Sequence, residues 1–289
     1  MTDAALARKG LAIYFSVVVV ASAILEWLII SGGGSLGDHM GLIMMLMWVP
    51  ALASLVARVA LREGMADVSF RLGGRRGVRA LAFGWLFPVF VGVVAYGVAW
   101  ASGLAGFDPP AVEGMAVQGP WARFGVNLLL ALSVGQVISA IFGAGEEIGW
   151  RGYMLTRLIR AGVPFPLVTS GLIWGLWHVP LILSGQYATG PDHLLSAGMF
   201  VISVVGAGVL IGWLRLYSGS VWPAVIAHGS WNVVIQDVFD RSTTGAEAGG
   251  AAAVWIGESG VLVIAVLLLS AALVTRVARV SPRVAAEQA

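Results

Sequence analysis

Long apolar stretches separated by short polar connections run through this chain from residue 11 to residue 275. Hydrophobic residues make up 58% of the 289 positions and charged residues 11%, whereas a soluble domain carries about 25% charged residues. A spanning helix needs about 20 apolar residues, and only helices and closed barrels satisfy their backbone groups in lipid. We therefore predict an all-α, polytopic membrane protein, with about eight transmembrane helices surrounding an intramembrane polar cavity.

The apolar stretches predict a single membrane domain over residues 1–289. The eight expected spans are 11–30, 41–61, 81–103, 124–158, 165–183, 194–216, 220–238 and 254–275. Within this domain, the first three helices occupy 11–104, the core motifs 120–240 and the last helix 254–275. The fourth stretch is too long for one straight span, so we expect it to tilt strongly or to begin outside the bilayer.

The basic residues indicate the orientation of the spans. Of the 17 Lys and Arg, only Arg123 and Arg241 fall on the side opposite to the other 15, so the positive-inside rule places both termini of this cell-membrane protein in the cytoplasm. Because these charges mark helix ends, we expect membrane lipid and no nucleic acid as a partner. The segment after Arg8 and Lys9 resembles a cleavable signal peptide, but apolar sequence continues to Ile30, which favours an uncleaved helix.

Cysteine and glycine usage adds two constraints. The chain has no cysteine, which excludes disulfides, thiolate metal sites and a cysteine nucleophile. Small residues four apart let helix backbones approach closely in lipid, and we expect this packing role for three glycine pairs. The pairs are Gly145/Gly149, Gly171/Gly175 and Gly208/Gly212.

Three polar clusters interrupt the apolar stretches. The clusters are Glu146-Glu147 with Arg151, then His178, then His228 with Asn232. An ionisable group in a bilayer costs roughly 2.5–3.5 kcal/mol by insertion scales, so such groups face one another or a wet cavity. The clusters therefore predict a functional site among the helices.

Helical spacing separates the roles within these clusters. Glu147 and Arg151 are four apart and can form an ion pair, while Glu146 points about 100° away and is expected to face a cavity. The alternative is a solvated charge cluster at a helix end. His178 taken alone is equally compatible with a simple hydrogen bond between helices.

This set of groups suits hydrolysis without a cofactor or metal. A buried carboxylate can act as a general base on water, and a nearby histidine can share the proton traffic. His228 and Asn232, four apart on one helix face, can donate hydrogen bonds to a developing oxyanion.

The order of the motifs resembles the CPBP family. The motifs are Glu-Glu-x-x-x-Arg from Glu146, aromatic-x-x-x-His from Trp174, and His-x-x-x-Asn from His228, on successive predicted helices. This family includes the eukaryotic type II CAAX prenyl endopeptidase and bacterial proteins tied to bacteriocin processing or immunity. The matching core runs from about residue 120 to 240. The second motif usually opens with Phe, and we expect Trp174 to keep the same packing.

The resemblance implies an intramembrane glutamate protease. Glu146 would activate the water with help from His178, and His228 and Asn232 would form the oxyanion hole. Glu147 and Arg151 would then be supporting residues. The expected reaction is hydrolysis of a peptide bond in a membrane-associated or lipidated protein or peptide.

Other functions stay open at this point. Two histidines and a glutamate could bind zinc, although there is no His-Glu-x-x-His motif and Asn232 is a poor zinc ligand. A non-catalytic immunity or binding protein would keep the same pocket. A transporter is a further alternative, but the sequence contains no detectable inverted repeat of the kind that many transporters have. The single lysine in a chain rich in Ala, Gly and Arg indicates a high-GC bacterium, where prenylated CAAX proteins are not expected, so the substrate stays open. Glu26, inside the first span, belongs to none of the motifs.

Overall fold

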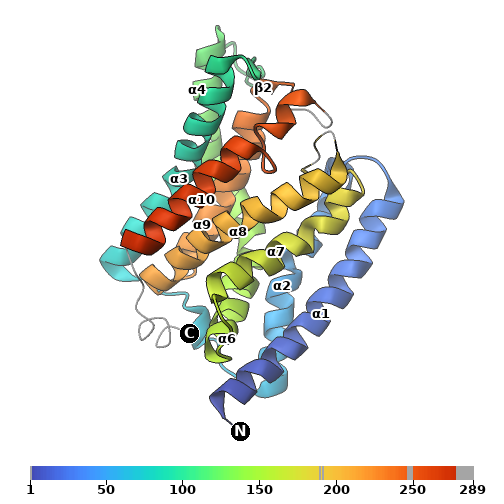
Figure 1. The fold of residues 1–289 in the computed structure, drawn as a ribbon, viewed down its shortest axis with the longest axis vertical. Coiled ribbons are helices and arrows are strands. Elements are labelled where there is room, and N and C mark those ends of the chain that lie inside the picture. The colour runs from blue at the N-terminus through green and yellow to red at the C-terminus, as the bar shows by residue number, and fades with distance from the viewer. Residues whose placement is uncertain (1, 189, 191, 246–249, 278–289) are drawn as a thin grey trace.

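The computed structural model describes residues 2–188, 190, 192–245 and 250–277, which form a bundle of helices (Figure 1). The long helices are α1 (Asp3–Gly32), α2 (Met40–Leu61), α3 (Gly74–Ser102), α7 (Pro166–Leu183), α8 (His193–Ser218) and α10 (Val261–Val277). Figure 1 shows α1 and α2 on one side of the bundle, α3 and α10 on the other, and α7 and α8 between them. The predicted all-α, polytopic fold is confirmed.

Each of the eight predicted spans corresponds to a helical segment. Among the described residues, six segments are long and apolar enough to cross a membrane: Asp3–Gly32, Leu36–Leu61, Gly74–Ser102, Pro120–Arg160, Pro166–Leu183 and His193–Ser218. The seventh span is α9 (Trp222–Trp231), which continues into the π-helical segment η5 (Asn232–Asp240). The last helix begins at Val261 rather than at 254, because η6 (Ala251–Val254) is a short 3-10 turn and Gly257 follows it with a φ of 78°.

The fourth span is one continuous helix of 41 residues. Its successive parts are α4 (Pro120–Leu130), η3 (Ala131–Gly135), α5 (Gln136–Gly149), η4 (Trp150–Met154) and α6 (Leu155–Arg160). The π-helical turns η3 and η4 interrupt the α geometry without ending the helix, as such turns commonly do near functional sites. The helix therefore continues through the Glu146 motif, and this carries the motif into the interior of the bundle.

Glycines bring neighbouring helices into backbone contact, as their spacing predicts. A Cβ added to Gly149 would lie 2.3 Å from the Cβ of Pro50, so α5 rests directly on α2. A Cβ added to Gly208 would lie 2.7 Å from the Cα of Gly171, so α8 and α7 are equally close. These approaches fix α5 and α7 relative to the rest of the bundle, and these two helices carry most of the polar motifs.

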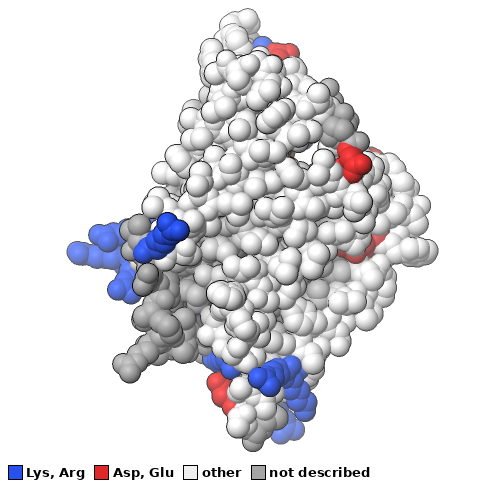
Figure 2. All heavy atoms as spheres, in the orientation of Figure 1, with Lys and Arg blue, Asp and Glu red and all other residues white. Residues whose placement is uncertain are grey.

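The outward faces of the helices are apolar. Large side chains such as Trp27, Leu129 and Leu269 have exposed fractions of 66%, 69% and 72%. Figure 2 shows a wide face without charge, with Lys and Arg gathered at its lower and left edges. Lipid would cover such a surface, whereas in water it would be an aggregation hazard.

A network of ion pairs anchors the connection between α2 and α3. Asp67, in η2 (Ala66–Val68), forms an ion pair with Arg58 at 2.5 Å and contacts Arg157 and Arg160, and Arg157 also bonds Glu63 at 2.8 Å. Burial of Asp67 opposes its ionisation, but hydrogen bonds and charges from Arg157 and Arg58 outweigh this and lower its pKa. The network ties this connection to the end of the fourth span.

Two short strands close the opposite end. β1 (Gly106–Phe107) and β2 (Thr243–Thr244) pair antiparallel, with Gly106 opposite Thr244. They join the connection after α3 to the one after η5. No other strand occurs in the described parts of the chain.

Candidate active site

Three helices bring the predicted site residues together. Glu146 and Glu147 lie on α5, His178 on α7, and His228 on α9, with Asn232 one turn further at the start of η5. The two glutamates and His228 are buried, with exposed fractions of 1%, 0% and 5%. The convergence that the motifs predict is present, although their catalytic roles stay a prediction.

Glu146 is held by two tryptophan side chains. Its Oε2 accepts a hydrogen bond from the indole Nε1 of Trp174 at 2.7 Å and another from Trp150 at 3.2 Å. Its Oε1 lies 3.9 Å from Nε2 of His228, too far for a direct hydrogen bond. One carboxylate oxygen is therefore fixed by neutral donors, and the other is turned towards an imidazole.

Glu147 forms the predicted ion pair and also contacts a histidine. Its Oε1 lies 2.7 Å from Nη1 of Arg151 and 2.8 Å from Nδ1 of His228. Because an ionised carboxylate only accepts, this contact assigns a proton to Nδ1 of the imidazole. The Arg151 guanidinium also lies over the ring of Trp174, 4.3 Å from its centroid, which adds a cation–π contact. Glu147 thus orients His228 through a contact that the spacing within one helix could not reveal.

His178 and Asn232 line a cavity next to these groups. Nδ1 of His178 donates to the backbone carbonyl of Trp174 at 2.9 Å, which leaves Nε2 as the acceptor of a neutral imidazole. Within the described residues, no carboxylate oxygen approaches a His178 nitrogen within 4.0 Å, so Glu146 lies closer to His228. The Asn232 carboxamide faces the same cavity, where it can hydrogen-bond a ligand.

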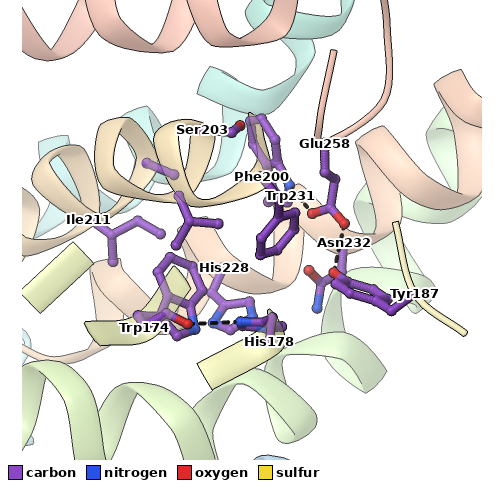
Figure 3. A pocket seen from close by; sticks show the side chains of 12 residues that line it. Trp174, His178, Tyr187, Phe200, Ser203, Ile211, His228, Trp231, Asn232 and Glu258 are labelled. Carbon is purple, nitrogen blue, oxygen red and sulfur yellow. Dashed lines mark hydrogen bonds between the residues drawn. The ribbon is translucent and has the colours of Figure 1, made fainter. Parts of the chain in front are cut away.

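The cavity has about 420 Å³ of empty volume and lies among α7, α8, α9 and the connection before α10. Its polar lining consists of His178, Tyr187, Ser203, His228, Asn232 and Glu258, and the indoles of Trp174 and Trp231 and apolar side chains from α8 complete it (Figure 3). Glu146 does not line this cavity, contrary to our expectation. The two indole bonds hold Glu146 behind the cavity wall, next to Trp174 and His228, which are part of that wall.

Sequence reasoning missed two groups of residues. The first comprises the indole donors, since Trp174 was expected only to pack and Trp150 was not considered, although it lies four residues after Glu146 on the same helix face. The second comprises Tyr187 and Glu258 at the cavity wall. The available signal was Glu258 itself, an acidic residue inside the stretch that was predicted as the last span.

One further buried carboxylate does not join the site. Glu26 is buried on α1, with an exposed fraction of 8%, but it does not line the cavity. In the parts of the chain that the structure describes, no three His, Cys, Asp or Glu side chains are grouped so that they could hold a metal ion.

The bundle and its buried polar centre define a class of polytopic membrane proteins with a site between spanning helices. Residues 125–234 match the family model described as type II CAAX prenyl endopeptidase Rce1-like, and this segment contains every predicted site residue. The core of the chain is therefore similar to this family.

A curated relative supports the same assignment. CAAX prenyl protease 2 from Methanococcus maripaludis is 34% identical over 88 residues, which cover 29% of this chain and 32% of that protein. The match thus spans about a third of the relative's length. It supports a CAAX-type membrane protease family, as the three motifs suggested.

Proposed function

We propose that the protein is an intramembrane endopeptidase that hydrolyses a peptide bond of a membrane-associated or lipidated substrate with a water molecule activated by Glu146. The observation that carries this proposal is the pair formed by Oε1 of Glu146 and Nε2 of His228, 3.9 Å apart. A water hydrogen-bonded to both atoms at about 2.8 Å would make an angle of about 90° between them, a normal geometry for a bridging water.

The reaction balances with the side chains present. The water oxygen attacks the carbonyl carbon while one of its protons passes to Glu146, which forms the new C–O bond and a tetrahedral oxyanion. The C–N bond then breaks, and the proton taken up by Glu146 is returned to the leaving nitrogen, relayed by Nε2 of the cavity-lining His178. The net change is the consumption of one water molecule.

Hydrogen-bond donors for the oxyanion would come from His228 and Asn232. Because Nδ1 of His228 donates to Glu147, its Nε2 must also carry a proton to donate, and the imidazole is then a cation. Glu146, Glu147, Arg151 and this imidazolium would together carry no net charge, which makes the arrangement tolerable in a membrane. Asn232 supplies a neutral second donor.

The same proposal places the protein in a cell membrane with both termini in the cytoplasm. The distribution of Lys and Arg along the chain supports this orientation. We propose membrane lipid and a peptide as its partners, and a bacterial source from the composition.

A comparison of membrane peptides tests the function. Cells that express the wild type should accumulate new peptide C-termini that are absent from cells with Glu146→Gln. Glu113→Gln is the matched control, because Glu113 is exposed in the connection after α3 and far along the chain from the site. Equal sets of C-termini in wild-type and Glu146→Gln cells, at equal protein levels, would reject the proposed hydrolysis.

A further inference from the structure

Glu258 is a second carboxylate on the cavity wall, and the hydrolysis described above does not use it. It lies in the connection between η6 and α10, and Figure 3 shows its carboxylate turned towards the cavity between Trp231 and Tyr187. It therefore shares one cavity with His178 and Asn232.

Hydrogen bonds hold Glu258 as an acceptor at both oxygens. Oε1 accepts from Nε1 of Trp231 at 2.7 Å, and an indole nitrogen can only donate. Oε2 accepts from the hydroxyl of Tyr187 at 2.6 Å, and that hydroxyl oxygen itself accepts from Nε2 of Gln236 at 3.2 Å. The chain of donors thus runs towards Glu258, which is the pattern of an ionised carboxylate.

In the described parts of the chain, no Lys, Arg or His nitrogen lies within 4.0 Å of the Glu258 carboxylate. Its hydrogen-bond donors, Tyr187 and Trp231, are neutral. Each carboxylate oxygen has a further lone pair, so Glu258 can accept two more hydrogen bonds. A fixed negative charge on an apolar wall attracts a cation more strongly than it would in water.

We propose that Glu258 binds a cationic group of the substrate, the ammonium of a lysine or the guanidinium of an arginine. This inference rests on the proposed function, because the ligand is a substrate only if the protein is an endopeptidase. It adds the chemical class of side chain that the cavity binds. Glu258 lines the same cavity as His178 and Asn232, so the cationic residue would lie close to the scissile bond.

Binding of three peptides tests this site without requiring turnover. The probes are dodecanoyl tetrapeptide amides that differ at one internal position, which holds lysine, Nε-acetyl-lysine or norleucine. Calorimetry is performed on the full chain with Glu146→Gln in nanodiscs of zwitterionic lipid, so that neither hydrolysis nor lipid charge contributes. The lysine peptide should bind about tenfold more tightly than either neutral peptide.

Two variants locate the origin of that preference. Glu258→Gln keeps an oxygen acceptor for one of its donors and should reduce the preference to less than twofold. Asp237→Asn should leave it intact, since Asp237 is 55% exposed in its side chain and pairs with Arg241 outside the cavity. The comparison of lysine with acetyl-lysine in protein that retains Glu258 tests the charge even if Glu258→Gln does not fold.

The outcomes separate this proposal from the endopeptidase proposal. Equal affinity of the three peptides, including no binding by any of them, overturns the cation site, and so does a lysine preference that survives Glu258→Gln. The same peptides are incubated with wild-type protein and analysed by mass spectrometry. Binding preference without hydrolysis would reject only the endopeptidase, and hydrolysis without preference would reject only the cation site.

Discussion

Replacement of Trp174 by Phe tests whether the indole N–H positions Glu146. Phe keeps an aromatic ring beneath the guanidinium of Arg151 and against His228, and removes the donor at 2.7 Å from Oε2 of Glu146 together with part of the ring volume. The family pattern usually has Phe at this position, so the ring fits the fold. The variant should therefore fold normally and lose activity in part.

The size of the loss follows from the two indole bonds. A hydrogen bond to a charged group contributes about 1.5–3 kcal/mol. Trp150 still holds the same oxygen from 3.2 Å, so we expect the lower end of this range. A loss of about 1.5 kcal/mol in transition-state stabilisation corresponds to roughly tenfold in kcat. Loss of Glu146 itself, the proposed general base, should cost far more.

Steady-state hydrolysis of a peptide found in the membrane-peptide comparison measures this effect. Trp174→Phe should lower kcat about tenfold with little change in KM, and Trp150→Phe should lower it less. Trp222→Phe is the matched control, because it deletes an indole bond of the same 2.7 Å length, to the carbonyl of Phe70, and Trp222 does not line the cavity. A kcat for Trp174→Phe within twofold of wild type, or an equal drop for Trp222→Phe, would refute the reasoning.

Three further predictions concern the cavity, the packing and the ion-pair network. Asn232→Ala should lower kcat about 100-fold through loss of an oxyanion donor and leave the melting temperature unchanged, and a matching loss of stability would contradict that role. Gly149→Ala should destabilise the fold by about 1–3 kcal/mol in thermal unfolding, since its Cβ would overlap Pro50, whereas Gly97→Ala has open space and should not. Asp67→Asn should cost about 3 kcal/mol at pH 7 by leaving buried arginines unpaired. Because its folded-state pKa is lowered, the stabilisation by Asp67 should be complete above about pH 4 and disappear as the pH falls further; no difference between wild type and variant at pH 7 would argue against it.

Much of the architecture could be predicted from the sequence because lipid imposes simple rules. Apolar length located all eight helical segments, and glycine spacing located contacts such as Gly149 on α2. The i, i+4 spacing gave the ion pair of Glu147 with Arg151, since both partners lie on one helix. The convergence of the motifs followed from the cost of isolated polar groups in a membrane.

The remaining features depend on contacts between helices, which no single-helix pattern contains. The bond of His228 to Glu147 joins α9 to α5, and the bond of Trp174 to Glu146 joins α7 to α5. Glu146 was expected at the cavity because its neighbour was already paired, but the indole of Trp174 occupies the position between. The start of the last helix was placed too early because Ala-rich sequence before Val261 reads as apolar although it forms a 3-10 turn and a loop.

The π-helical turn η4 determines how the residues that follow it in the longest helix are rotated about the helix axis. A π-helical turn contains one residue more than the α-helical turn that it replaces, and each residue rotates a helix by about 100°. Deletion of one residue within Gly152–Met154 should restore an α-helical turn, so that the segment up to Arg151 keeps its orientation while Arg157 turns away from its acidic partners. One-residue insertions and deletions after Arg151 would therefore rotate the end of the helix relative to its centre and leave the bonds of Trp150 and Arg151 to the two glutamates in place.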